Sequence, residues 1–150
     1  MTGFSSLERV GGALTIRSSD ALLDLRGFDK LSLVGESLLI SGHDSMIDLS
    51  GLESLTQIGG GLVIQTNFAL ESLSGLDNLS SIGSKLVVGS NKLLYDMKSL
   101  DNLAYLAGDL SIIYNPDLPE CQAEALRDRL QEQGWSGNAE IHDNFGLCEE

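Results

Sequence analysis

The chain has 150 residues, which fits one domain, and 42% of them are hydrophobic, which excludes a disordered chain. Asp and Glu total 22 against 9 Lys and Arg, for a formal net charge of −13. Since binding to nucleic acid and to anionic membranes depends on Lys and Arg, this charge argues against both partners, and no apolar run approaches the ~20 residues needed for membrane insertion.

A 24-residue repeat runs without an insertion from Phe4 to Leu118. Such a repeat indicates a solenoid, because one unit cannot bury its apolar residues alone whereas stacked units share a continuous core. Within a unit, Leu62-Val63-Ile64 alternates like a strand, and the every-third-residue spacing that follows predicts short strands and corners. We therefore predict a β-solenoid of about five 24-residue rungs. The clearest of its apolar columns consists of Leu14, Leu38, Leu62, Leu86 and Leu110.

The N-terminus begins within a unit, because Phe4 already lies on the 24-residue grid. The first six residues contain neither the basic nor the apolar region of a secretion signal. We expect the chain to be a segment of a longer protein. The alternative is that its uncapped N-terminal end stacks on a partner, which would make a homo-oligomer.

Glycine and asparagine columns mark the corners of the predicted rungs. A recurring Gly is expected where the backbone needs a positive φ or where rungs approach closely. Asn carries a donor and an acceptor, so an inward Asn column predicts a ladder that satisfies the backbone of successive rungs; the alternative is a polar row that binds a ligand. The glycines are Gly27, Gly51 and Gly75 at one corner and Gly35, Gly59 and Gly83 at another. The ladder comprises Asn67, Asn91, Asn115 and, after a break, Asn144, with His43 and Ser19 in the same register earlier.

The outward side of the longer strands is the predicted binding face. Leu39, Val63 and Val87 would form an aliphatic strip along it, and an exposed apolar patch usually marks a contact surface. The alternatives are that another part of a longer protein covers the strip, or that the strip is tolerated. The predicted face comprises Thr15, Arg17, Leu39, Ser41, Val63, Gln65, Val87, Ser111 and Ile113.

An acidic column follows one corner at the same 24-residue steps: Asp29, Glu53, Asp77 and Asp101. Stacked carboxylates ~5 Å apart repel by roughly 1 kcal/mol per pair in water. A calcium ion would relieve this repulsion, since it favours oxygen ligands. We favour the simpler interpretation of a solvated acidic edge and predict no metal site.

The segment after Leu118 predicts a cap. Pro119 to Gln133 is typical of a helix, with an apolar stripe at Ala125, Leu126 and Leu130. The spacing of residues 110–115 returns at 139–144, so one further rung follows the helix. The two cysteines, Cys121 and Cys148, flank the helix and this rung and predict one disulfide; two buried free thiols are the alternative. We predict a single solenoid domain over 1–150, with repeats over 4–118 and the cap over 119–150.

The repeat unit resembles the receptor L-domain. Residues Gly51 to Asn67 carry the pattern G-L-x-x-L-x-x-I-G-G-x-L-x-I-x-x-N, and the tail from Asn115 through Cys121 and Trp135 to Cys148 is similar to the cap of secreted bacterial members. Such repeats also occur in the insulin and epidermal growth factor receptors and in bacterial and protist surface proteins. The resemblance implies a right-handed β-helix related to leucine-rich repeats, and a non-catalytic role at the cell surface or outside the cell.

The residues do not indicate an enzyme or a cofactor. His43 and His142 are the only histidines, and no catalytic triad order, phosphate-binding loop or zinc spacing occurs. Our hypothesis is a non-catalytic recognition or adhesion module whose sheet face binds a protein or glycan partner. The alternative is a structural spacer that self-associates. A third, a β-helical carbohydrate-active enzyme, would need basic residues beside the acidic column and long loops, which this register lacks.

Overall fold

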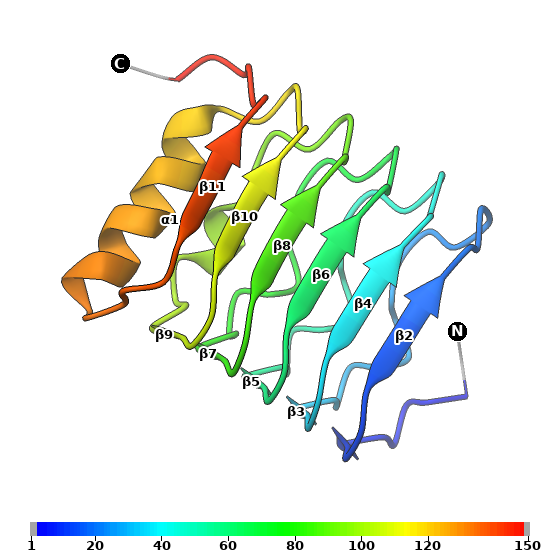
Figure 1. The fold of residues 1–150 in the computed structure, drawn as a ribbon. Coiled ribbons are helices and arrows are strands. Elements are labelled where there is room, and N and C mark those ends of the chain that lie inside the picture. The colour runs from blue at the N-terminus through cyan, green and yellow to red at the C-terminus, as the bar shows by residue number, and fades with distance from the viewer. Residues whose placement is uncertain (1–2, 149–150) are drawn as a thin grey trace.

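The computed structural model describes residues 3–148 and contains a parallel β-solenoid with one α-helix near its C-terminal end (Figure 1). Each rung up to β10 has a short strand followed by a long one, and in the last rung α1 precedes the long strand. The long strands form a six-stranded sheet of β2 (Leu14–Arg17), β4 (Leu38–Ser41), β6 (Leu62–Gln65), β8 (Leu86–Gly89), β10 (Leu110–Ile113) and β11 (Ala139–His142). The short strands form a five-stranded sheet of β1 (Arg9–Val10), β3 (Leu33–Val34), β5 (Gln57–Ile58), β7 (Ser81–Ile82) and β9 (Tyr105–Leu106). The predicted β-solenoid is confirmed.

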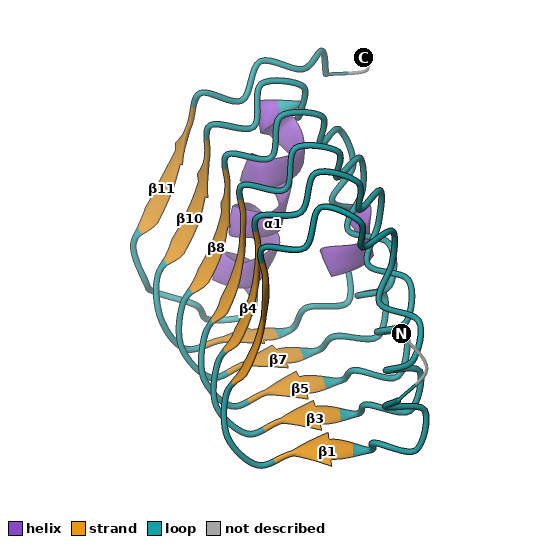
Figure 2. Ribbon diagram, turned by 90° about the vertical axis from the view of Figure 1, so that its right-hand side faces the viewer, coloured by secondary structure: helices purple, strands orange, loops and turns teal. Residues whose placement is uncertain are grey.

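Strand register follows the sequence period. Leu62 lies opposite Leu38 on one side and Leu86 on the other, so equivalent residues of successive units form straight columns. Figure 2 shows the two sheets as two sides of the solenoid, with loops closing the third. We call this third side the loop side; it consists of the segments that run from each long strand to the next short strand. The 3-10 helix η1 (Lys98–Leu100) lies within it.

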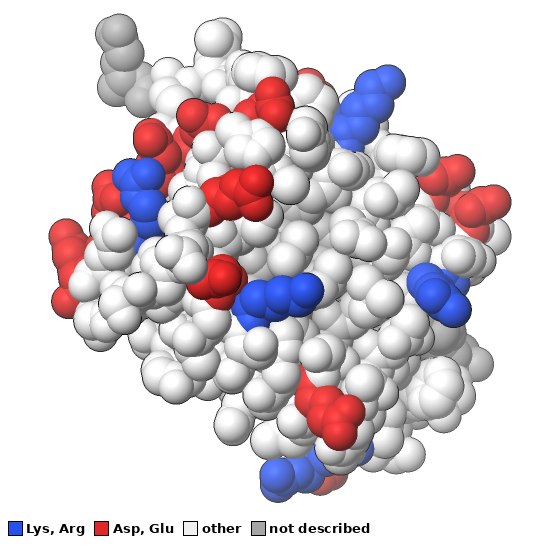
Figure 3. All heavy atoms as spheres, in the orientation of Figure 1, with Lys and Arg blue, Asp and Glu red and all other residues white. Residues whose placement is uncertain are grey.

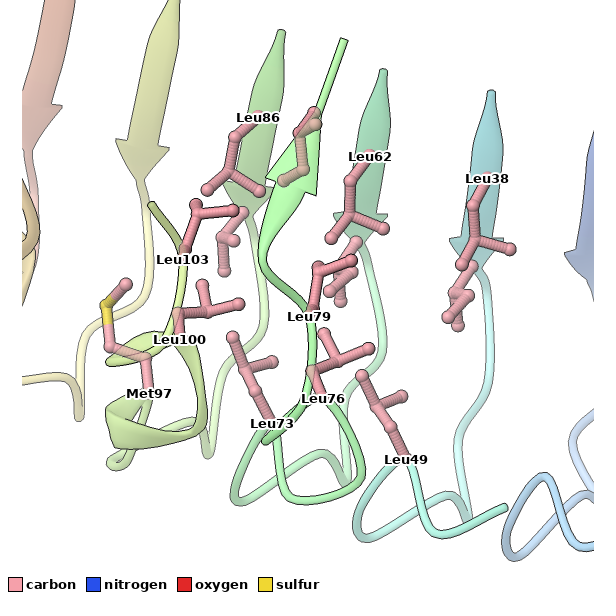
Figure 4. Close-up of a cluster of buried hydrophobic side chains, with 14 of the residues drawn as sticks. Leu38, Leu49, Leu62, Leu73, Leu76, Leu79, Leu86, Met97, Leu100 and Leu103 are labelled. Atoms are coloured by element: carbon pink, nitrogen blue, oxygen red, sulfur yellow. The ribbon is translucent and has the colours of Figure 1, made fainter. Parts of the chain in front are cut away.

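Leucine stacks fill the space between these three sides (Figure 4). Leu73, Leu76 and Leu79 of one loop segment point toward the strands that carry Leu62 and Leu86, and all five are fully buried. Burying one such side chain contributes about 1.5–3 kcal/mol. The spacing of three arises because the chain turns between these leucines, so that each one can face the common core.

Both glycine columns meet the requirements expected of them. Gly51 has a φ of +113°, and a Cβ there would run into the Leu25 carbonyl of the preceding rung. Gly59 keeps an ordinary φ, but a Cβ would strike the Gly35 carbonyl in the same way. One corner therefore needs the left-handed conformation and both need the close approach of neighbouring rungs.

The cap is built on α1 (Glu120–Glu132), which lies against the last rungs. Ala123, Leu126 and Leu130 form its buried stripe. The prediction of Ala125 in this stripe was wrong: Ala125 is exposed, because spacings of three and four from Leu126 and Leu130 place Ala123 on the inner face instead. A disulfide joins Cys121 to Cys148, with 6.1 Å between the two Cα atoms. The free-thiol alternative therefore does not hold, and the bridge ties the first turn of α1 to the segment after β11.

Side chains of the cap replace the hydrogen bonds of a missing rung. Gln122 accepts a hydrogen bond from the Met97 N–H at 3.0 Å and donates one to the Tyr95 carbonyl at 3.1 Å. Its side-chain amide thereby occupies the place of the next peptide group on the loop side. The Trp135 indole N–H donates to the Gly108 carbonyl at 2.8 Å near the other corner. These polar contacts give partners to three backbone groups at the end of the ladder.

Candidate functional site

The six-stranded sheet presents the predicted binding face as two straight columns. Strand pairing places Thr15, Leu39, Val63, Val87 and Ser111 in one column. The second column is Arg17, Ser41, Gln65, Gly89 and Ile113. The structure therefore brings together all nine predicted face residues, since strands in a parallel sheet lie about 4.8 Å apart.

The side chains of the aliphatic strip are less exposed than predicted. Leu39, Val63 and Val87 are half-buried, because side chains on strands so closely spaced cover one another's flanks. Arg17 and Gln65 are exposed beside the strip. Figure 3 shows this face: uncharged atoms cover most of it, and acidic side chains gather mainly toward the side of α1 and β11. The result is a largely uncharged surface with an aliphatic centre.

Gly89 interrupts the second column of this face. It has no side chain between Gln65 and Ile113, and an added Cβ would meet the Ile113 carbonyl oxygen only at an ordinary contact distance of 3.4 Å. The sheet geometry at this position therefore tolerates a side chain. Gly89 itself is buried, so neighbouring side chains cover this position of the face.

An ionisable cluster completes the face at its C-terminal end, and the predicted set of face residues does not include it. Strand β11 adds Glu140 and His142 to the two columns. His142 Nδ1 lies 2.7 Å from Asp143 Oδ2, and its Nε2 lies 3.2 Å from Glu140 Oε1. The Tyr114 ring packs edge-to-face against the imidazole, with 5.4 Å between the ring centroids. The hydrogen bond to Asp143, and then that to Glu140, raises the pKa of His142 above its ordinary value. The signal was present in the sequence, as the return of the strand pattern at 139–144.

The Asn column forms a buried ladder inside the corner. The Asn91 side-chain oxygen accepts from the Asn67 backbone N–H at 3.1 Å, and its Nδ2 donates to the Ile64 carbonyl at 3.1 Å. Asn115 and Asn144 repeat this arrangement in the next rungs. These side chains have no exposed surface to speak of, so the ladder holds the corner together rather than meeting a ligand.

His43 occupies the first buried position of that ladder. Its Nδ1 lies 3.1 Å from the Ser19 carbonyl and its Nε2 lies 3.2 Å from the Ile16 carbonyl. A neutral imidazole has one N–H, so it donates to one of these carbonyls at a time. Ser19, which the sequence places in the same register, is exposed and is not part of the buried ladder.

The acidic column satisfies backbone donors of its own corner. The N–H of Gly51 donates to Glu53 at 2.9 Å and that of Gly75 donates to Asp77 at 3.0 Å; Gly27 and Asp29 do the same at 2.9 Å. Asp101 instead forms an ion pair with Arg129 of α1 at 3.3 Å. Over residues 3–148, no group of three or more His, Cys, Asp or Glu side chains is arranged to hold a metal ion.

Comparison with known proteins gives one match. The family model described as Receptor L domain matches residues 32–150. Searches of curated proteins and of solved structures gave no significant match. Within the described part of the chain, no helix is long and apolar enough to cross a membrane.

Proposed function

Because the chain belongs to the receptor L-domain family, a family of non-catalytic ligand-binding modules, we propose that it acts outside the cell as a recognition or adhesion module. It binds a protein or glycan partner through the outward face of the six-stranded sheet. The disulfide between Cys121 and Cys148 supports an oxidising, extracellular compartment.

The observation that carries this proposal is the composition of the sheet face. Leu39, Val63 and Val87 form a continuous aliphatic strip in an otherwise strongly acidic molecule. Arg17 and Gln65 beside the strip supply donors that can pair with carbonyl or hydroxyl oxygens of a partner. An apolar centre with a polar margin is the usual anatomy of a recognition surface.

Partner binding by a Val63→Arg variant tests the sheet face. The biotinylated protein is screened against a glycan array and a panel of extracellular protein domains, and each hit is measured by surface plasmon resonance. We expect Val63→Arg to weaken binding by roughly tenfold or more, because the charged side chain interrupts the strip. The control is Gln57→Arg on β5, an exposed position of the five-stranded sheet, which should leave affinity unchanged. A folded Val63→Arg variant that binds like the wild type would contradict the proposal.

End-to-end association is a second candidate, favoured by the first rung. Phe4 is 45% exposed and stacks on Phe28 with ring centroids 5.0 Å apart. Leu14 and Ile16 are only half-buried, although their counterparts in the next four rungs are buried. Within residues 3–148, no strand pairs with the outer edge of β2. Light scattering over a concentration series tests this function: dimers abolished by Phe4→Asp but kept by Val63→Arg would support it, and a monomer throughout would oppose it.

A further inference from the structure

A second surface, formed by the loop side and the adjoining segment after β11, carries most of the exposed large apolar side chains. Leu23, Ile47, Glu71 and Tyr95 occupy the same position of successive rungs: the N–H of Ile47 donates to Leu23 at 3.4 Å, that of Glu71 to Ile47 at 2.8 Å, and that of Tyr95 to Glu71 at 3.0 Å. Leu23 is 62% exposed, Ile47 51% and Tyr95 53%. The loop side also carries the exposed side chains of Phe68 and Leu93. The segment after β11 adjoins it and adds the exposed Phe145, whose N–H donates to the Pro116 carbonyl at 3.1 Å, and the exposed Leu147.

This row, in which Glu71 separates the apolar Ile47 from Tyr95, ends in a hollow beside the start of α1. The hollow has a volume of about 560 Å³, and the side chains of Tyr95, Pro119 and Leu147 form its apolar walls. Leu147 is 90% exposed, so most of its apolar surface faces solvent. A second hollow of about 270 Å³ continues along α1 and shares Lys98, Cys121 and Gln122 with the first. The volume of the first hollow lies within the range of ordinary ligand sites.

The charges around the hollow favour a cation. Asp96 and Asp117 line it against one basic residue, Lys98, and the whole chain carries a net charge of −13. One oxygen of Asp96 accepts the Lys98 backbone N–H at 2.9 Å. In the described part of the chain neither carboxylate forms an ion pair. Asp96, Asp117 and Tyr95 all line the hollow, and carboxylates and aromatic π-faces both attract a guanidinium or ammonium group.

From this combination we infer that the hollow docks a short segment of a protein partner in which an Arg or Lys lies next to apolar side chains. The cation lies between Asp96 and Asp117, and the neighbouring apolar side chains pack on Tyr95 and Leu147. This surface is separate from the sheet face, so the inference does not depend on the function proposed above.

The probe for this site is the tripeptide acetyl-Leu-Arg-Leu-amide, titrated into ¹⁵N-labelled protein and followed by NMR. We expect saturable shifts of the backbone amides of Tyr95, Lys98, Gln122 and Leu147. The peptide with citrulline in place of arginine keeps the shape of the side chain but loses its charge. Its affinity should be at least about fivefold lower. Asp117→Asn should weaken binding of the arginine peptide, while Glu36→Gln, at an exposed corner elsewhere, should not.

Tyrosine variants separate the aromatic contribution from the charge. Tyr95→Ala should abolish the shifts, whereas Tyr105→Ala, at a tyrosine of similar 57% exposure on β9, should preserve them. Equal binding of the arginine and citrulline peptides would overturn the inference, as would shifts confined to the sheet face. Stronger shifts of the same amides with the uncharged disaccharide cellobiose would also overturn it and assign the hollow to a glycan.

Discussion

At the scale of single residues, the corner of the solenoid depends on amide side chains that act in two rungs at once. The Asn91 side chain accepts from the Asn67 N–H and donates to the Ile64 carbonyl, both in the preceding rung. The Asn91 backbone N–H donates to the side-chain oxygen of Asn115 in the following rung. An aliphatic side chain of similar volume would fill the space but leave these backbone groups unpaired. The sequence predicts this ladder because Asn recurs at an inward position.

Replacing Asn91 by leucine is expected to lower the free energy of unfolding by about 2–5 kcal/mol, since two buried backbone groups lose their partners. Urea unfolding followed by circular dichroism measures the change. The matched control is Asn78→Leu, which removes an exposed hydrogen bond to the Glu53 carbonyl and should cost less than about 1 kcal/mol. Equal effects of the two substitutions would show that burial of the ladder contributes nothing.

His142 makes the far end of the sheet face sensitive to pH. Its hydrogen bonds to Asp143 and Glu140 raise its pKa, so the imidazolium is favoured in the folded state. The stabilisation is complete below the ordinary pKa of histidine, about 6.5, and is lost as the pH rises through the raised folded value. An NMR titration of the imidazole should give a midpoint above 6.5, and Asp143→Asn should lower it. A midpoint that Asp143→Asn leaves in place would contradict the assigned cause.

At the scale of elements, α1 is a cap whose polar side chains make hydrogen bonds in place of the backbone of a further rung. Gln122 pairs with two backbone groups of the loop side, the Met97 N–H and the Tyr95 carbonyl, and Arg129 donates to a third, the Leu100 carbonyl, at 3.0 Å. The helix and its disulfide were predictable from the apolar spacing and the cysteine positions. The roles of Gln122 and Arg129 were not, because each occurs once and a single polar residue on a helix leaves no periodic trace.

Removing the disulfide by the double substitution Cys121→Ser and Cys148→Ser is expected to lower the free energy of unfolding by about 3.5 kcal/mol, the chain-entropy estimate for the loop closed by a separation of 27 residues. Calorimetry or urea unfolding measures the loss. Hydrogen exchange should quicken in α1 and β11 well before it does in β4 and β6, which lie far from the bridge. The wild type in reducing buffer is the control and should behave like the double variant; uniform exchange along the chain would argue against a local clamp.

At the scale of the whole molecule, like charges are stacked at a fixed spacing. The carboxylates of Asp29, Glu53 and Asp77 lie in successive rungs, and each accepts a backbone hydrogen bond at its corner. Their structural role explains their position, while the net charge of −13 adds repulsion that salt can screen. Sequence spacing alone predicted the column. The hydrogen bonds to glycine depend on local turn geometry, which spacing does not reveal.

Raising the sodium chloride concentration from low to physiological values is therefore expected to raise the thermal midpoint. Glu53→Gln keeps an oxygen for the Gly51 N–H but removes one charge from the middle of the column, so its change in stability at low salt should stay within about 1 kcal/mol and its salt dependence should be smaller. Calorimetry at several ionic strengths measures both quantities. Calcium chloride should act only through ionic strength; a larger stabilisation by calcium, lost in Glu53→Gln, would instead reveal a cation site.

The two candidate surfaces differ in how far the sequence predicts them. The sheet face follows from strand alternation, although the half-burial of Val63 depends on its neighbours in three dimensions. The loop-side row was missed because its members do not repeat: Ile47, Glu71 and Tyr95 occupy equivalent positions but share no chemistry. A column can be recognised in the sequence only when the same residue type recurs at each step. A row of different residue types, such as this one, gives no such signal.

The unbroken 24-residue register also means that the number of rungs sets the distance between the two ends of the molecule. Since every internal rung presents the same columns to the rung on either side, a whole unit such as residues 62–85 can be duplicated or deleted with the stacking preserved. Each duplication would move the cap, with its hollow, about 4.8 Å further from the first rung. Evolution or an engineer can thus tune the separation between the two ends in fixed steps without redesigning either one.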